Sequence, residues 1–186
     1  MKIDSKDVAL TAVFAALYVV INVLQMFSIG NPTIYGPLQL RVADCLLALA
    51  ALFGWPVVGG VTLGCFVSNN IYFLGLQDVV LGSIANLIAS SVIFLLRKNR
   101  LLACIAGALP IGIIVGSYLP IFFPPPDVLS LWGPYVGMII SVTLSSLVAV
   151  VLIGYPLLLM MSRPSILGPL KSHGLKVAVR SAKKTL

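Results

Sequence analysis

The sequence has few of the side chains that acid–base and metal chemistry require. It contains no glutamate, and its single histidine, His173, lies in a basic C-terminal segment. Its three cysteines lie in separate apolar runs without a C-x-x-C pair, so we expect small buried hydrophobic residues rather than disulfides, redox thiols or a zinc cluster: Cys45, Cys65 and Cys104. The nucleotide-binding pattern G-x-x-x-x-G-K-[ST] is also absent. We therefore expect no metal, no cofactor, no enzyme activity and no ATP hydrolysis by this chain.

Charge is also scarce. Only 9% of the 186 residues are charged, against roughly 25% in soluble domains. Hydrophobic residues make up 60% of the chain, and its mean hydropathy is +1.11. This composition predicts an all-α integral membrane protein with one helical bundle.

Six apolar stretches are candidates to cross a bilayer core about 30 Å thick, which takes about 20 helical residues. Clusters of Gly and Pro or of basic residues separate them. The stretches are residues 8–27, 38–53, 57–74, 78–96, 101–122 and 134–161. The second is short, and Pro156 is expected to bend or shift the last one. The first exceeds the roughly 7–15 residues of a signal-peptide core, so we interpret it as a retained helix.

The basic residues predict an orientation for this bundle. Of the 12 Lys and Arg residues, all but Arg41 lie near the two ends of the chain or in the short cluster at residues 97–100. Six crossings place all three segments on the cytoplasmic side, as the positive-inside rule requires. We therefore expect a six-helix transmembrane domain over residues 1–162, a basic cytoplasmic tail over residues 163–186, and no role in binding nucleic acid.

Polar residues gather in the outer parts of these predicted spans. They include Gln39, Arg41, Asn69, Tyr72 and Asp78. Asp44 lies about six residues into its span, and Asn86 lies two turns below Asp78 on roughly the same helix face. Arg41 and Asp44 stand at i and i+3 of a helix, where they can pair, either as a structural lock or as the lining of a polar cavity. Asp78 is either an N-cap or a ligand contact. Together, these side chains are typical of a site for a flat polar ligand.

Small residues at four-residue spacing also recur, for example Gly60 with Gly64 and Gly112 with Gly116. Such pairs allow helices to approach closely within the membrane, so we expect them to pack the bundle. Two longer outer loops, residues 28–37 and 123–133, either cover a site or anchor the chain at the interface.

Three motifs resemble those of the queuosine-precursor transporter (QueT) family. They are G-P-L-Q-L-R-V-A-D, L-G-C-F-V-S-N-N and G-L-Q-D-V-V-L-G-S-I-A-N-L-I-A. The resemblance implies a substrate-binding S component of an energy-coupling factor (ECF) transporter in a prokaryotic plasma membrane. It implies six helices, cytoplasmic termini and an outer pocket for a deazaguanine-type base. It also implies a transmembrane coupling subunit and two cytoplasmic ATPases as partners, with Ala12 and Ala16 at the interface.

By motif position, the resemblance assigns the pocket to Gln39, Arg41, Asp44, Asn69, Asp78 and Ser83. Asp44 departs from the family's usual glutamate, and Asn86 from its commoner threonine. Asp78 is the expected main carboxylate contact, and Tyr35, Tyr72 or Trp132 the expected stacking residue. Two other interpretations stay open: a proton-coupled transporter that works alone, and a membrane scaffold without a ligand.

Overall fold

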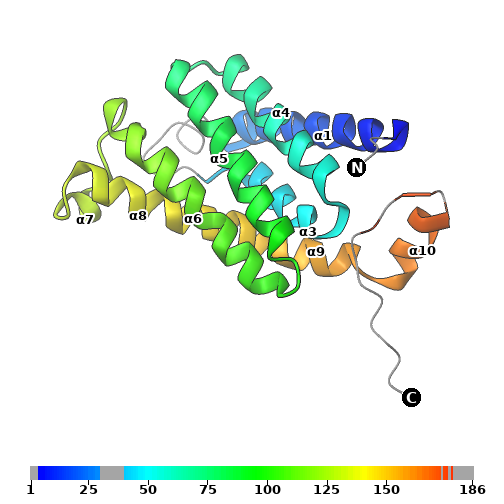
Figure 1. The fold of residues 1–186 in the computed structure, drawn as a ribbon. Helices are drawn as coiled ribbons and strands as arrows, with labels where there is room; N and C mark the ends of the chain where they lie inside the picture. Colours follow the sequence, from blue (N-terminus) through cyan, green and yellow to red (C-terminus); the bar gives the residue numbers. More distant parts are fainter. Residues whose placement is uncertain (1–3, 30–39, 173, 176, 178–186) are drawn as a thin grey trace.

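The computed structural model describes residues 4–29, 40–172, 174–175 and 177, and these residues form helices and turns with no strand. The helices follow one another along the chain as shown in Figure 1. They are α1 (Ser5–Ile29), η1 (Val42–Leu49), α3 (Ala50–Phe53), α4 (Trp55–Ile71), α5 (Leu76–Leu95), α6 (Arg100–Tyr118), η2 (Leu119–Ile121), α7 (Asp127–Ser130), α8 (Pro134–Leu147), η3 (Val148–Gly154), α9 (Tyr155–Met161) and α10 (Pro164–Ser172). The predicted all-α fold is confirmed for this part of the chain.

Helices occupy all six stretches that the sequence predicts as spans, although not all are long enough to cross a membrane. Four are long and apolar enough, namely Ser5–Ser28, Leu76–Leu95, Arg100–Ile121 and Pro134–Met161. The helix Val42–Phe53 is shorter, and α4 has 17 residues. Six crossings and the side on which each terminus lies stay predictions.

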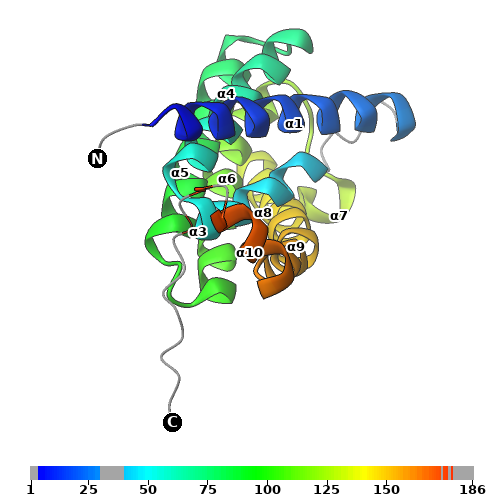
Figure 2. The ribbon, with the colours of Figure 1, turned by 90° about the vertical axis from the view of Figure 1, so that its right-hand side faces the viewer.

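Neighbouring helices pack closely where glycines face the adjacent backbone. A Cβ on Gly60 would lie 2.7 Å from the carbonyl oxygen of Thr11, and one on Gly64 would lie 2.9 Å from that of Ala15. These two glycines bring α4 against α1, and the two helices lie side by side in Figures 1 and 2. Gly116 similarly brings α6 against Ile139 of α8. The predicted packing role of these small residues is confirmed.

The short second segment lies at the centre of the bundle. Every residue from 43 to 53 is buried, as expected for a helix that is apolar on all sides. It contacts α1, α4, α5, η3 and α9. Residues 41 to 44 therefore lie within reach of several helices.

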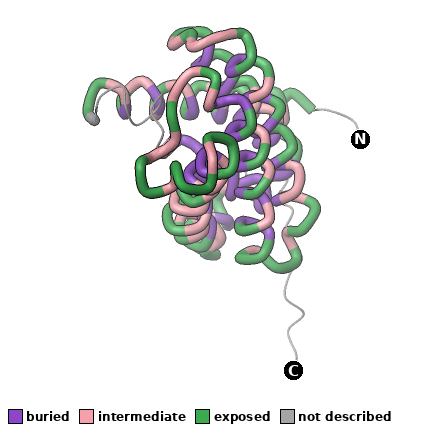
Figure 3. Tube along the Cα trace, turned by 90° about the vertical axis from the view of Figure 1, so that its left-hand side faces the viewer, coloured by how far each residue is buried: buried purple, intermediate pink, exposed green. Residues whose placement is uncertain are grey.

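Many large apolar side chains are exposed, while 13 polar or charged residues of the described part of the chain are buried. Figure 3 shows how buried and exposed residues are distributed along the chain. On α1, for example, Val13 is 52% exposed and Leu24 is 58% exposed, but Asn22 and Gln25 are buried. This inverted pattern is typical of a helix that faces lipid on one side.

The last long helix changes its hydrogen bonding at the predicted position. The wider π-helical turn η3 immediately precedes Tyr155 and Pro156, and proline cannot donate the backbone hydrogen bond of a regular α-helix. Within this turn, Gly154 lies so close to η1 that a Cβ would be 2.8 Å from the carbonyl oxygen of Cys45. The altered turn therefore supports the central segment.

Candidate ligand-binding site

Arg41 reaches across the bundle to Asp78. It directly precedes η1 with an extended backbone, φ −86° and ψ 102°, and its Nη2 lies 3.3 Å from Oδ1 of Asp78 on α5. Its Nη1 also lies 3.6 Å from Sγ of Cys65 on α4. Arg41 is 6% exposed and Asp78 is 0% exposed, so this is an ion pair within the bundle.

The predicted ion pair between Arg41 and Asp44 is wrong. That prediction places both residues on one helix, but Arg41 lies before the helix begins, so the i, i+3 spacing does not set its direction. Its guanidinium group instead points toward α5. Asp44 faces a different set of partners.

Asp78 is held by several elements. Its Oδ1 accepts a hydrogen bond from the Tyr118 hydroxyl of α6 at 2.7 Å, and its backbone oxygen accepts one from Nδ2 of Asn69 at 2.8 Å. Gly75, not Asp78, is the N-cap of α5, and the Asp78 side chain lies inside the bundle. The interpretation of Asp78 as an N-cap is therefore wrong, while its burial is that of a residue in a polar site.

Asp44 belongs to a second hydrogen-bonded group. Its Oδ1 accepts from the Tyr18 hydroxyl at 2.6 Å and from Nδ2 of Asn86 at 3.4 Å. Asn86 also donates to the Tyr18 hydroxyl at 2.9 Å. As the sequence predicts, Asp78 and Asn86 both lie on the buried face of α5, with Gly82 between them.

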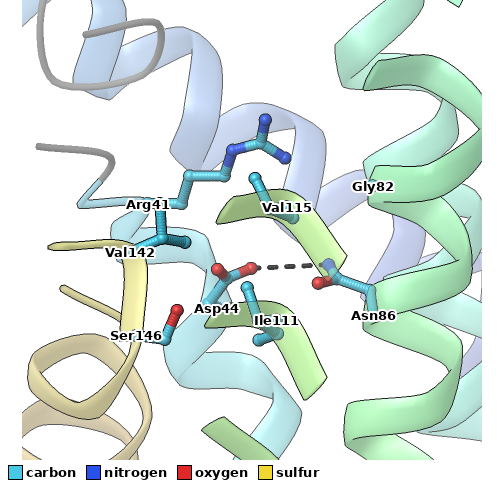
Figure 4. A pocket seen from close by; sticks show the side chains of 8 residues that line it. All are labelled: Arg41, Asp44, Gly82, Asn86, Ile111, Val115, Val142 and Ser146. Atoms are coloured by element: carbon cyan, nitrogen blue, oxygen red, sulfur yellow. Dashed lines mark hydrogen bonds between the residues drawn. The ribbon is translucent and has the colours of Figure 1, made fainter. Parts of the chain in front are cut away.

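A small cavity lies between Arg41 and the group of Asp44 and Asn86, and Figure 4 shows its lining, which does not include Asp78 or Asn69. Its polar residues are Arg41, Asp44, Asn86 and Ser146, and its apolar wall consists of Ile111, Val115 and Val142. The open centre of the cavity is about the size of one water molecule. Apolar side chains with a few polar groups among them are typical of ligand-binding pockets.

Two charged atoms at this site lack a hydrogen-bond partner among the described residues. They are Nε of Arg41, a donor, and Oδ2 of Asp78, an acceptor, and both are buried. Buried polar atoms are nearly always satisfied, and leaving one unpaired costs about 1–3 kcal/mol. The ion pair thus keeps one unpaired donor, on an arginine that lines the cavity, and one unpaired acceptor, on an aspartate outside its lining.

The remaining predicted site residues have different positions. Ser83 is buried, but its hydroxyl donates to the Val79 carbonyl of its own helix at 2.7 Å. Tyr72 is half-buried at the end of α4, and Trp132 is 66% exposed beyond α7; neither lines the cavity. Tyr35 and Gln39 lie outside the described residues.

The sequence analysis does not predict three residues of the site: Tyr18, Gln25 and Tyr118. Tyr18 is 0% exposed and Tyr118 is 4% exposed, although each occurs in an apolar run. The available signal is the hydroxyl group, which needs a partner when it is buried within a span. Among the described residues, no three His, Cys, Asp or Glu side chains are grouped as metal ligands would be. The site has the chemistry to hold a polar ligand.

Comparison with known proteins identifies the family. A family model described as QueT transporter matches residues 8–163. The chain belongs to the QueT transporter family. The matched region includes every described element that contributes to the site.

One curated member of the QueT family is similar over part of its length. The queuosine precursor transporter QueT of Lactococcus lactis subsp. cremoris (strain MG1363) is 34% identical over 91 residues, which are 49% of this chain and 51% of that protein. The chain thus spans about half the length of the curated relative it matches. No solved structure matches. The expected relationship to the QueT family is confirmed.

Proposed function

We propose that this protein is the substrate-binding S component of an ECF transporter, and that it captures a deazaguanine-type precursor of queuosine or archaeosine at the outer membrane face. Family membership supports a transport role. The observation that carries the ligand assignment is the buried Arg41–Asp78 pair with one unpaired donor and one unpaired acceptor.

A deazaguanine base matches these two atoms. It has a ring carbonyl beside a ring N–H, so it offers one acceptor and one donor on the same edge. The carbonyl would accept from Nε of Arg41, and the N–H would donate to Oδ2 of Asp78. The planar ring would lie against the apolar wall of Ile111 and Val115.

The charges at the site favour a cationic form of this base. The site contains one cation, Arg41, and two acids, Asp44 and Asp78. With both acids ionised, it holds one negative charge more than Arg41 balances. A deazaguanine with an aminomethyl group carries a positive charge that offsets this excess, and Asp44 is the acid that Arg41 does not pair.

The closed cavity must widen to hold the base. Ligand pockets usually enclose roughly 300–1,000 Å³, whereas the open centre here is about the size of one water molecule. The lining comes from the η1 segment, α5, α6 and α8. Separation of these elements at their outer ends would open the cavity to the ligand.

Topology and partners belong to the same proposal. Six crossings place both termini in the cytoplasm of a prokaryotic cell and the polar site near the outer face of the plasma membrane. Ala12 and Ala16 are exposed on α1, where their small side chains leave room for another helix. We assign this face to a transmembrane coupling subunit, which acts with two cytoplasmic ATPases.

Native mass spectrometry of the purified protein tests the ligand assignment. A deazaguanine should remain bound. Guanine should displace it readily, and unrelated vitamins should not displace it. Retention of an unrelated mass, or no retention at all, would contradict it. Uptake in cells should require the coupling subunit and ATPases, whereas uptake that depends only on a proton gradient would overturn the S-component assignment.

A further inference from the structure

Gln25 of α1 binds the backbone on both sides of Arg41. Its Nε2 donates to the carbonyl oxygen of Leu40 at 2.5 Å, and its Oε1 accepts from the backbone N–H of Val42 at 2.8 Å. Gln25 is 6% exposed. One side-chain amide thus spans the residue that carries the cation of the site.

The hydrogen bond from Val42 to Gln25 caps the start of η1. Val42 is the first residue of η1, and the first N–H groups of a helix have no partner within it. Arg41 occupies the N-cap position but makes no side-chain capping bond, because a guanidinium group has only donors and cannot accept from a backbone N–H. Gln25 therefore satisfies, from another helix, one of the N–H groups that have no partner at the start of η1.

The two bonds also fix the direction of the Arg41 side chain. Residues 40 and 41 lie outside any helix, and the Arg41 backbone is extended. Holding the carbonyl before Arg41 and the N–H after it restricts the rotations that aim the side chain. The long arginine side chain would amplify any small change in these angles at its guanidinium group.

We propose that Gln25 is a positioning residue that aims the Arg41 guanidinium at Asp78 and thereby sets how the site recognises the ligand carbonyl. The role in recognition rests on the proposed function, but the aiming of Arg41 does not. Since Tyr18 of α1 also donates to Asp44, one helix holds both charged residues of the η1 segment in place.

Two variants separate this role from general packing. Gln25→Leu removes both bonds while keeping a buried side chain of similar size, and Asn22→Leu is the matched control. Asn22 lies on the same buried face of α1 but donates to Oγ of Ser68 on α4 at 3.3 Å. If Gln25→Leu does not fold, Gln25→Asn replaces it, because its shorter side chain cannot span both backbone groups.

The first readout needs no ligand. In protein labelled with ¹⁵N-arginine, the Nε–H signal that disappears in Arg41→Lys is that of Arg41. This signal should shift or broaden in Gln25→Leu and stay in place in Asn22→Leu. An unchanged Arg41 signal in a folded Gln25 variant would overturn the proposal, whatever the protein binds.

The second readout compares two ligands: a deazaguanine and its analogue without the ring carbonyl. Gln25→Leu should bind the deazaguanine about tenfold more weakly than the parent and the analogue equally well, so that discrimination is lost. Equal weakening of both ligands would indicate general loosening and would contradict a role in carbonyl recognition. If the parent binds neither ligand while the Arg41 signal still responds to Gln25→Leu, the proposed function fails but the positioning role stands.

Discussion

At the scale of single residues, the two buried acids of the site have different tasks. Asp78 faces Arg41 and Tyr118, which leaves one of its oxygens for a neutral N–H donor. Asp44 faces Tyr18 and Asn86, which donate hydrogen bonds but carry no charge. The proposed function therefore assigns to Asp44, rather than to Asp78, the contact with a cationic group on the ligand.

Replacing Asp44 should change ligand preference. The parent should bind an aminomethyl-deazaguanine more tightly than a neutral analogue with a methyl group in that position. Asp44→Asn should reduce this preference about tenfold, because it removes a buried negative charge while keeping a polar side chain of the same size. Titration calorimetry with both ligands measures the ratio of affinities, and a preference equal to that of the parent would contradict this role.

The sequence predicts which residues are polar and inward-facing better than it predicts their partners. Asp78 and Asn86 share a face of α5 because helical periodicity determines it. The pairing of Arg41 cannot be predicted in this way, because residue 41 lies outside the helix that begins at Val42. The sequence does not predict Tyr18 and Tyr118 as partners of the two acids, because a tyrosine in an apolar run fits a position at the membrane interface equally well.

At the scale of secondary-structure elements, the contact between α1 and α4 supports the site. Gly64 of α4 lies against Tyr18, and a Cβ there would be 2.6 Å from the Tyr18 Cβ. Tyr18 in turn donates to Asp44. Close packing of these two helices thus determines where one hydrogen-bond donor of the site lies.

Adding a methyl group at this contact should separate the helices. Gly64→Ala should lower the free energy of unfolding by about 1–3 kcal/mol, because the backbone of α1 leaves no room for the new atom. Gly59→Ala is the control on the same helix, since its Cβ would lie 3.5 Å from the nearest atom, in ordinary contact. Thermal unfolding in detergent should show a lower Tm for Gly64→Ala only, and equal Tm values would contradict the account.

Element positions are largely predictable here, since glycine, proline and basic clusters separate the apolar stretches. The lengths of the elements are less predictable from the sequence. Helix α4, the third predicted span, begins at Trp55 rather than at residue 57, because Gly54 adopts φ +71° and Pro56 fits the first helical turn. The burial of the whole segment 43–53 is a tertiary feature that hydropathy alone does not distinguish from a lipid-facing span.

At the scale of the whole molecule, the account requires a bundle with its polar site toward the outer face. Asn99 is exposed in the turn between α5 and α6, and Ser130 is exposed at the end of α7. Six crossings place these two residues on opposite sides of the membrane. The positive-inside rule predicts that the turn with the basic cluster around Asn99 lies in the cytoplasm.

Cysteine labelling of intact cells tests this arrangement. In a variant without native cysteines, Ser130→Cys should react with an impermeant maleimide from outside, and Asn99→Cys should react only after the cells are opened. Labelling of Asn99→Cys from outside, or protection of Ser130→Cys, would contradict the six-span topology.

The central claim is that Asp78 and Arg41 form the recognition site for a deazaguanine base, and titration calorimetry with Asp78→Asn tests it most directly. Asp127→Asn is the matched control, because it makes the same chemical change on the exposed helix α7. The account predicts binding by the parent and by Asp127→Asn, and binding at least about tenfold weaker in a folded Asp78→Asn variant. Equal affinity of Asp78→Asn and the parent would contradict it.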